Sequence, residues 1–245
     1  MGRLTAGALI KSNESTNKAV SWSVFDSVTV LFGTQFLTIL VGVVVYSVAQ
    51  VGSGDRAPFW VTAMIWPAIW IGYAGGTWMV SATKGGGIRA DFGTRCNAFD
   101  AIVGAVLGVG LQLLIIPLLY WPILRFVDAD PSRQAKEHFE QVGGVGQWVM
   151  LVMAVVVMAP LVEELFFRGL MLRSLEHRFG RVAAVLVSSG VFALVHFDWI
   201  LVPGLFAFGL VTSMVVLFTG RLGMAVALHM GFNLTTVVLL GWQSN

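Results

Sequence analysis

Charged side chains are scarce in this sequence: Asp, Glu, Lys and Arg together make up 11% of the 245 residues. Soluble domains carry about a quarter charged residues, so this scarcity excludes an ordinary soluble globular domain. The net charge of +2 is too small to indicate a nucleic-acid partner. A single cysteine, Cys96, excludes an internal disulfide and a cysteine-rich metal site. Because 57% of the residues are hydrophobic, disorder is excluded as well, and a polytopic membrane protein is the class that remains.

Seven stretches of the chain contain no Asp, Glu, Lys or Arg. A helix needs about 20 apolar residues to cross about 30 Å of hydrocarbon, and all the stretches except 182–197 reach that length. A β-barrel would show alternating strands of about 10 residues, which these continuous runs are not. The sequence therefore predicts an all-α, polytopic transmembrane helical bundle of about seven spans, with an eighth in an irregular or re-entrant piece left open. The stretches are 27–54, 57–83, 101–124, 141–162, 182–197, 199–220 and 222–245.

The chain divides into four parts by composition. We expect a polar cytoplasmic tail at 1–21, three N-terminal transmembrane helices at 22–126, a polar connector with a short surface helix at 127–144, and a catalytic helical bundle at 145–245. Lys and Arg are most frequent in alternate connections, which favours a cytoplasmic N-terminus and, with seven spans, a C-terminus on the outer side. The expected location is the plasma (inner) membrane.

The first unusual polar residues follow an uncharged stretch in the C-terminal part: Glu163, Glu164 and Arg168. Ionisable groups inside a bilayer are costly and are candidates for function. On a helix, residues four apart share a face, whereas sequence neighbours point about 100° apart. Glu164 and Arg168 are therefore predicted to form an ion pair, and Glu163 is predicted to project into a cavity. A structural role for both carboxylates is the alternative.

Two histidine motifs lie further along the chain. His229 and Asn233 are four residues apart and share a helix face, so both polar groups point at one place. His196 and Glu163 lie at nearly equal distances from Gly180, about 25 Å along a helix on either side, which supports a single site. We expect this site near the inner third of the membrane, open to the cytoplasm. An interhelical hydrogen-bonded pair and a buried core histidine are the structural alternatives.

A carboxylate and a histidine that converge on a partly dry cavity can activate a water molecule. A second histidine and an asparagine can stabilise the oxyanion of an attacked carbonyl, where one donor contributes about 3–4 kcal/mol. The chain has no Gly-x-Ser-x-Gly elbow, and Cys96 lies in a loop without a nearby histidine in sequence. A serine or cysteine nucleophile is therefore disfavoured, and the residues favour peptide hydrolysis without a covalent intermediate.

Three motifs, Glu-Glu-x-x-x-Arg, Phe-x-x-x-His and His-x-x-x-Asn, occur in this order over the last spans. In this the chain resembles the CPBP family, which comprises CAAX prenyl endopeptidases of the Ras-converting type and bacteriocin-processing and immunity proteins. The resemblance implies an intramembrane endopeptidase with the motifs around a shared cavity. It assigns water activation to Glu163 and His196, oxyanion binding to His229 and Asn233, and a supporting role to Glu164, Arg168 and Phe192.

Several alternatives remain open at this point. Zinc could be bound by Glu163, His196 and His229 with one open position, although the chain has no His-Glu-x-x-His motif and no cofactor is favoured. A non-proteolytic membrane scaffold or bacteriocin-immunity protein could retain the polar residues for packing. A transporter or proton relay could also use buried Glu and His. The expected partners are the lipid bilayer and a peptide or lipidated-protein substrate.

Overall fold

The computed structural model describes residues 21–52 and 54–243, and within these ranges every regular element is a helix. The predicted all-α fold is therefore confirmed, while nearly all of the predicted tail at 1–21 lies outside the described residues. The helical elements, with η for π-helical segments, are α1 (Val24–Val48), α2 (Phe59–Trp70), η1 (Ile71–Gly75), α3 (Gly76–Lys84), α4 (Ile88–Phe92), α5 (Ala98–Gly110), η2 (Leu111–Ile115), α6 (Ile116–Ile123), α7 (Arg133–Glu140), α8 (Val145–Val152), η3 (Met153–Met158), α9 (Ala159–Glu164), η4 (Leu165–Met171), α10 (Leu172–Phe179), α11 (Arg181–Leu194), α12 (Val202–Thr219) and α13 (Leu222–Gln243).

Among the described residues, five continuous helical runs are long and apolar enough to cross a membrane. The remaining two of the seven uncharged stretches are also helical: one is the run at 59–84, formed by α2, η1 and α3, and the other is the shorter α11. Length and composition thus identify five of the seven expected spans, and the chain is a polytopic helical bundle. The five runs are Val24–Val48, Ala98–Ile123, Val145–Phe179, Val202–Thr219 and Leu222–Trp242.

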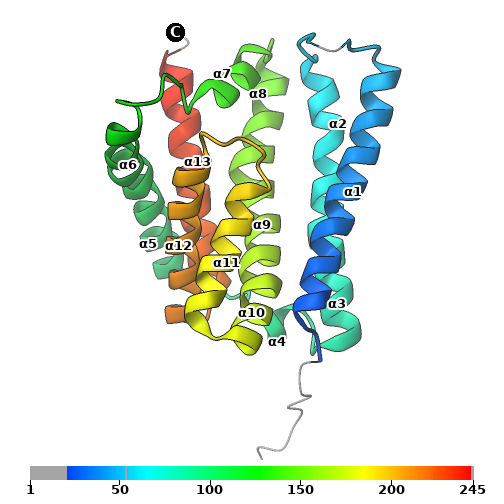
Figure 1. Cartoon of the computed structure of the whole chain (residues 1–245), viewed down its shortest axis with the longest axis vertical. Helices are drawn as coiled ribbons and strands as arrows, with labels where there is room; N and C mark the ends of the chain where they lie inside the picture. Colours follow the sequence, from blue (N-terminus) through cyan, green and yellow to red (C-terminus); the bar gives the residue numbers. More distant parts are fainter. Residues whose placement is uncertain (1–20, 53, 244–245) are drawn as a thin grey trace, which may run out of the picture.

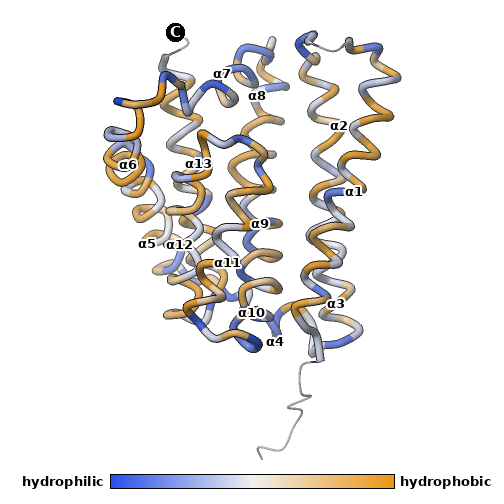
Figure 2. The backbone as a smooth tube through the Cα atoms, in the orientation of Figure 1, coloured by the Kyte–Doolittle hydropathy of each residue, from blue (hydrophilic) through white to orange (hydrophobic). Residues whose placement is uncertain are grey.

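The helices form two groups (Figure 1). α1 packs against α2, η1 and α3, and this group meets the rest of the bundle through η1, α1 and α3 against α9, η4 and α10. In the larger group, α13 packs along α5 and also contacts α12, while α11 packs between α10 and α12. Hydrophobic residues dominate the middle of the helices, and hydrophilic residues gather at their ends (Figure 2). This distribution is the one that a lipid environment requires.

The polar connector lies across the end of the bundle at which the C-terminus is also found (Figure 1). Its short helix, α7, follows an aspartate turn in which Asp130 accepts hydrogen bonds from Ser132 and from the Lys136 ammonium group. The Lys136 ammonium group lowers the pKa of the Asp130 carboxyl to about 2, with further help from Ser132. The turn before α7 is therefore held by an ionised carboxylate at neutral pH.

Small residues set the distance between α5 and α13. A Cβ atom at Gly104 would press on the carbonyl oxygen of Met224, and one at Gly108 would overlap the carbonyl oxygen of Leu228. In return, a Cβ at Gly231 of α13 would overlap the backbone of α5. The Gly-x-x-x-Gly spacing thus lets the two backbones come into direct contact, as such motifs do in membrane helices.

Replacement of Gly108 by alanine is expected to lower the thermal unfolding temperature in detergent. The added methyl group must displace α13, and overpacking of this kind costs about 1–3 kcal/mol. Gly110 is the matched control, because no atom lies within 4 Å of the position that its Cβ would take. Gly110→Ala should leave the unfolding temperature unchanged or raise it, and equal effects of the two changes would contradict the role of Gly108.

Candidate active site

The Glu-Glu-x-x-x-Arg motif lies where α9 passes into the π-helical segment η4. Oε1 of Glu164 accepts a hydrogen bond from Nη1 of Arg168 at 3.1 Å, and both side chains are fully buried. The ion pair predicted from the four-residue spacing is therefore present. The Arg168 guanidinium also lies over the face of Phe192, 4.4 Å from the ring centroid. The aromatic face provides a further favourable contact for a cation that has left water.

His229 joins this pair from α13, which is far away in sequence. Its Nδ1 lies 2.9 Å from Oε1 of Glu164. An ionised carboxylate can only accept, so Nδ1 carries a proton, and in the neutral tautomer that this bond selects Nε2 presents a lone pair. Nε2 lies 4.0 Å from Oε2 of Glu163. A single water oxygen can reach both atoms across that gap at ordinary hydrogen-bond distances.

The two neighbouring carboxylates have different surroundings. The Glu163 side chain is 19% exposed, whereas that of Glu164 is fully buried and holds Arg168 and His229. Only Glu163 is thus open to a ligand. None of the three cavities described for this part of the chain is lined by Glu163, so its predicted projection into a cavity stays a prediction.

Aromatic rings surround the histidine. The Phe208 centroid lies 4.6 Å and the Phe192 centroid 6.1 Å from the His229 ring. Phe192 also packs edge to face against His196, with centroids 4.9 Å apart, so one buried phenylalanine contacts members of all three motifs. These rings replace water around the polar network, and electrostatic interactions are stronger in such an environment.

His196 follows directly after α11 and hydrogen-bonds the carbonyl oxygen of Phe192 through Nδ1, at 2.7 Å. Because a carbonyl only accepts, Nδ1 carries the proton here too, and Nε2 is left free. The contacts among the described residues include no hydrogen bond or ion pair between His196 and Glu163. Phe192 contacts both the His196 ring and the His229 ring.

Asn233 lies one helical turn after His229 on α13. It donates one amide hydrogen to the carbonyl oxygen of Val155, in the π-helical segment η3, at 2.8 Å. The side-chain amide has a second N–H group, which this bond leaves available.

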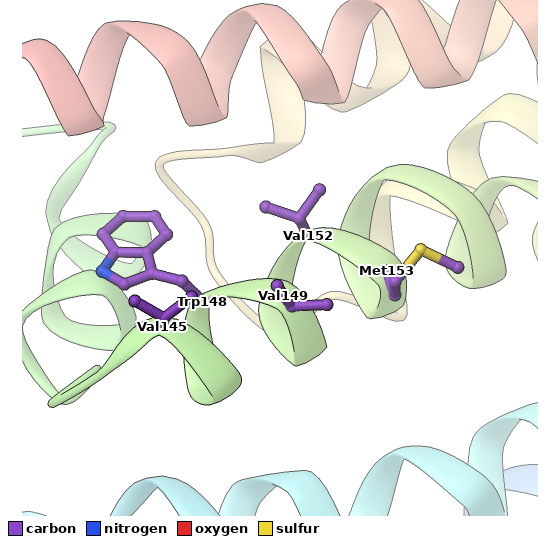
Figure 3. A pocket seen from close by; sticks show the side chains of 5 residues that line it. All are labelled: Val145, Trp148, Val149, Val152 and Met153. Carbon is purple, nitrogen blue, oxygen red and sulfur yellow. The ribbon is translucent and has the colours of Figure 1, made fainter.

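A cavity of about 460 Å³ adjoins the cluster. His196 and Asn233 line it together with Gln112, and it extends to Phe139 of α7. A second hollow of about 340 Å³ lies beside α8 (Figure 3). Its walls are side chains without acid, base or nucleophile, namely those of Val145, Trp148, Val149, Val152 and Met153. Of these two cavities, the first carries groups that can take part in acid–base chemistry or hydrogen bonding.

The structure thus arranges the predicted residues in two adjoining sets. Glu163, Glu164, Arg168 and His229 form one contiguous polar network against Phe192. His196 and Asn233 line the neighbouring cavity instead.

Two polar residues of the N-terminal helices were not singled out from the sequence. Tyr73 of η1 stacks on Phe166, with centroids 4.5 Å apart, and its hydroxyl accepts a hydrogen bond from Gln35 at 3.2 Å. Tyr73 also interacts electrostatically with Glu163. Polar residues within otherwise apolar spans are the signal that points to such positions.

Gln112 of η2 is a third such residue. It lies in the cavity wall, and its Oε1 is buried without a hydrogen-bond partner. A buried acceptor without a partner is costly, so this oxygen is available to a donor on a bound ligand.

The arrangement does not fit zinc at the three residues that the sequence offered for it. Among the residues that the structure describes, no group of three His, Cys, Asp or Glu side chains is placed to hold a metal ion. Nδ1 of His229 is taken by Glu164, and Nδ1 of His196 is taken by the carbonyl oxygen of Phe192.

The fold and the site together define an integral membrane protein that carries a buried Glu–Arg–His network in its C-terminal bundle. Residues 145–235, somewhat more than a third of the chain, match the family model of type II CAAX prenyl endopeptidases, Rce1-like. This match contains all three motifs and confirms the resemblance drawn from them. The comparison with curated proteins and that with solved structures find no match.

Arg168→Met should destabilise the protein strongly, because it leaves the Glu164 carboxylate buried without its counter-charge. Loss of one partner of a buried pair typically costs about 3–5 kcal/mol. The control is Arg181→Met, which removes an exposed pair with Glu176; exposed pairs contribute about 0–1 kcal/mol. The unfolding temperatures of the two variants are compared in detergent. Similar values would show that the Glu164–Arg168 pair contributes no more to stability than an exposed pair.

Proposed function

We propose that this chain is an intramembrane endopeptidase that cleaves peptide bonds at or near the membrane with water activated by Glu163. The observation that carries the proposal is the pairing of the one exposed carboxylate with Nε2 of His229 at 4.0 Å. The orientation of that imidazole is fixed by a carboxylate that is itself ion-paired with Arg168. A carboxylate base beside a histidine that a second group orients is an arrangement that supports water activation.

In the proposed reaction, a water molecule lies between Oε2 of Glu163 and Nε2 of His229. Glu163 takes a proton from this water as its oxygen attacks the carbonyl carbon of the peptide. The protonated Glu163 then delivers the proton to the departing nitrogen, which completes the hydrolysis. The His229 ring orients the water throughout, because Glu164 holds its Nδ1 hydrogen.

Asn233 and His196 act on the substrate side of this scheme. The second amide hydrogen of Asn233 is available to the oxyanion that forms when the carbonyl is attacked. Nε2 of His196 faces no protein partner in the described contacts and lines the same cavity, so it is free to accept a substrate N–H group. The family resemblance assigns His196 to the water itself; we favour the substrate instead, because His196 lines the cavity and makes no hydrogen bond or ion pair with Glu163 in the described contacts.

A non-proteolytic membrane scaffold or immunity protein is the second candidate. The observation in its favour is that His196 and Asn233 each bond a backbone carbonyl, as purely structural residues do. A scaffold would need neither an exposed Glu163 nor a cavity beside the polar network, and these two features make the endopeptidase the first choice.

Glu163→Gln should reduce cleavage of quenched fluorescent peptides, farnesylated CAAX peptides among them, by roughly 10²–10⁴-fold, the usual contribution of a general base. The volume of the side chain is nearly unchanged, so the unfolding temperature should stay the same. Glu137→Gln in the exposed part of α7 is the matched control and should retain full activity. Equal activity of wild type and Glu163→Gln would exclude the mechanism, and full cellular function of that variant would favour the scaffold.

Cleavage by the wild type should be unaffected by a strong chelator, because the proposed water activation needs no metal. The same peptides serve as the assay, with the chelator applied before the substrate. Loss of activity that zinc restores would overturn this mechanism and make the zinc-dependent protease the better description.

A further inference from the structure

One end of the bundle carries an excess of positive charge. The starts of α1 and α5 meet there with α3, α4, the α10–α11 turn and the α12–α13 turn (Figure 1). Among the described residues, seven basic and four acidic side chains lie at this end, so the acids are too few to neutralise the bases. The basic residues are Lys84, Arg89, Arg95, Arg173, Arg178, Arg181 and Arg221. The acidic ones are Asp26, Asp91, Asp100 and Glu176.

All four carboxylates already have partners. Asp91 accepts hydrogen bonds from the Ser81 hydroxyl and from the backbone N–H of Gly86. The other three form ion pairs, namely Asp26–Lys84, Asp100–Arg221 and Glu176–Arg181. In the described part of the chain, no carboxylate at this end is therefore left to pair with a further arginine.

Three exposed arginines remain, and none of them has a carboxylate partner in the contacts of the described residues: Arg89, Arg95 and Arg178. Arg178 lies over the ring of Phe179, 5.5 Å from its centroid. Like charges that share one surface repel each other, and an anionic partner would relieve this repulsion.

Packing fixes the segment that carries Arg89 and Arg95. Phe92 of α4 lies between them in sequence and is fully buried. Its carbonyl oxygen accepts a hydrogen bond from Arg173 at 3.1 Å. The carbonyl oxygen of Gly93 accepts another, at 3.0 Å, from the first N–H group of α13. The two arginines therefore extend from a segment that is held in place.

Arg178 belongs to the same surface. Its neighbour His177 stacks on Trp22, with ring centroids 5.5 Å apart. Trp22 in turn packs against Phe92, with centroids 5.8 Å apart. These ring contacts join α10 to α4, so the three arginines extend from one contiguous group of elements.

Exposed aromatic rings mark the level of this end in the membrane. They lie on α1, α3, α5, α10 and α12, near the ends that these helices have there. In a polytopic membrane protein such rings contact the hydrocarbon and its boundary, and charged side chains beyond them reach the headgroups. The unpaired arginines therefore lie at the level of the lipid phosphates. The rings are those of Phe25, Trp78, Phe99, Phe179 and Phe218.

From the unpaired arginines and their level in the membrane we infer that this end of the protein binds the headgroups of anionic phospholipids through Arg89, Arg95 and Arg178. The planar guanidinium group matches the oxygens of a phosphate with two parallel hydrogen bonds. Connections rich in Lys and Arg stay in the cytoplasm, and the cytoplasmic leaflet is rich in anionic lipids. A zwitterionic phospholipid carries a cation beside its phosphate and offers these arginines no net counter-charge.

Bound lipid also supports the segment that carries the candidate active site. Phe92 of α4 lies against η4, where a Cβ atom on Gly169 would come within 3.3 Å of its ring. Gly169 directly follows Arg168, the partner of Glu164. A lipid that holds α4 in place therefore also holds this segment, and a ligand that binds only the folded protein raises its unfolding temperature.

The test measures the unfolding temperature of the full-length protein in detergent while phosphatidylglycerol is added. Phosphatidylcholine with the same acyl chains and inorganic phosphate at constant ionic strength are separate arms. Phosphatidylglycerol should raise the unfolding temperature, and the other two should leave it unchanged. The combined change Arg89→Gln, Arg95→Gln and Arg178→Gln should raise the half-saturating concentration of phosphatidylglycerol by roughly 10²-fold, about fivefold for each charge.

The matched control removes the same charge from the opposite end. Arg56→Gln, Arg125→Gln and Arg133→Gln together should keep the response of the wild type. If the variant at the basic end does not fold, its three single changes replace it, each with an expected change of about fivefold. High salt should weaken the response of the wild type, because it screens exposed charges.

Equal responses to phosphatidylglycerol and phosphatidylcholine would overturn the inference. Equal losses in the two triple variants would also overturn it, because they would show an effect of net charge alone. A response to inorganic phosphate would overturn the choice of a lipid and indicate a free anion as the ligand. None of these measurements needs proteolysis, so inactivity against every peptide would count against the proposed function and leave the lipid-binding surface standing.

Discussion

The rest of the site depends on one buried charge pair. Glu164 and Arg168 are both fully withdrawn from water, and the cost of removing two charges from solvent is recovered only with good geometry and further partners. That recovery is incomplete here, because Oε2 of Glu164 and two nitrogens of Arg168 have no hydrogen-bond partner in the described structure. A protein with apolar residues of similar volume in place of this pair is often at least as stable. The presence of the pair is therefore better explained by its role in orienting His229.

The ion pair gives two adjacent carboxylates, Glu163 and Glu164, different roles. Glu164 accepts hydrogen bonds from Arg168 and from Nδ1 of His229. The second of these bonds fixes the direction of the imidazole ring. Glu163, one residue earlier, takes no part in the ion pair and stays partly exposed. Its Oε2 lies 4.0 Å from Nε2 of His229. The Glu-Glu dipeptide of α9 therefore has two roles: Glu163 remains a free carboxylate, and Glu164 orients the His229 imidazole of α13. The aromatic rings of Phe192 and Phe208 keep water from competing for the same atoms.

The sequence predicts the parts of this arrangement that follow from helix periodicity and hydropathy. These are the helical class and the Glu164–Arg168 pair. It does not predict contacts that depend on how separate helices pack, such as the hydrogen bond from His229 to Glu164 or the electrostatic interaction of Tyr73 with Glu163. Spacing along one helix also cannot show that Phe192 contacts both His196 and His229, because that is a matter of rotamers and tertiary contacts.

The four π-helical segments of the described chain, η1 to η4, share a property with a wider consequence. Each carries part of the site or its surroundings: Tyr73, Gln112, the carbonyl of Val155, and Arg168. A π-turn amounts to one extra residue in an α-helix. Its deletion would restore ordinary α-helical winding and remove the wide turn that carries these groups. Among relatives of this chain, single-residue gaps at these places would therefore separate lineages that keep the chemistry from lineages that keep only an apolar bundle.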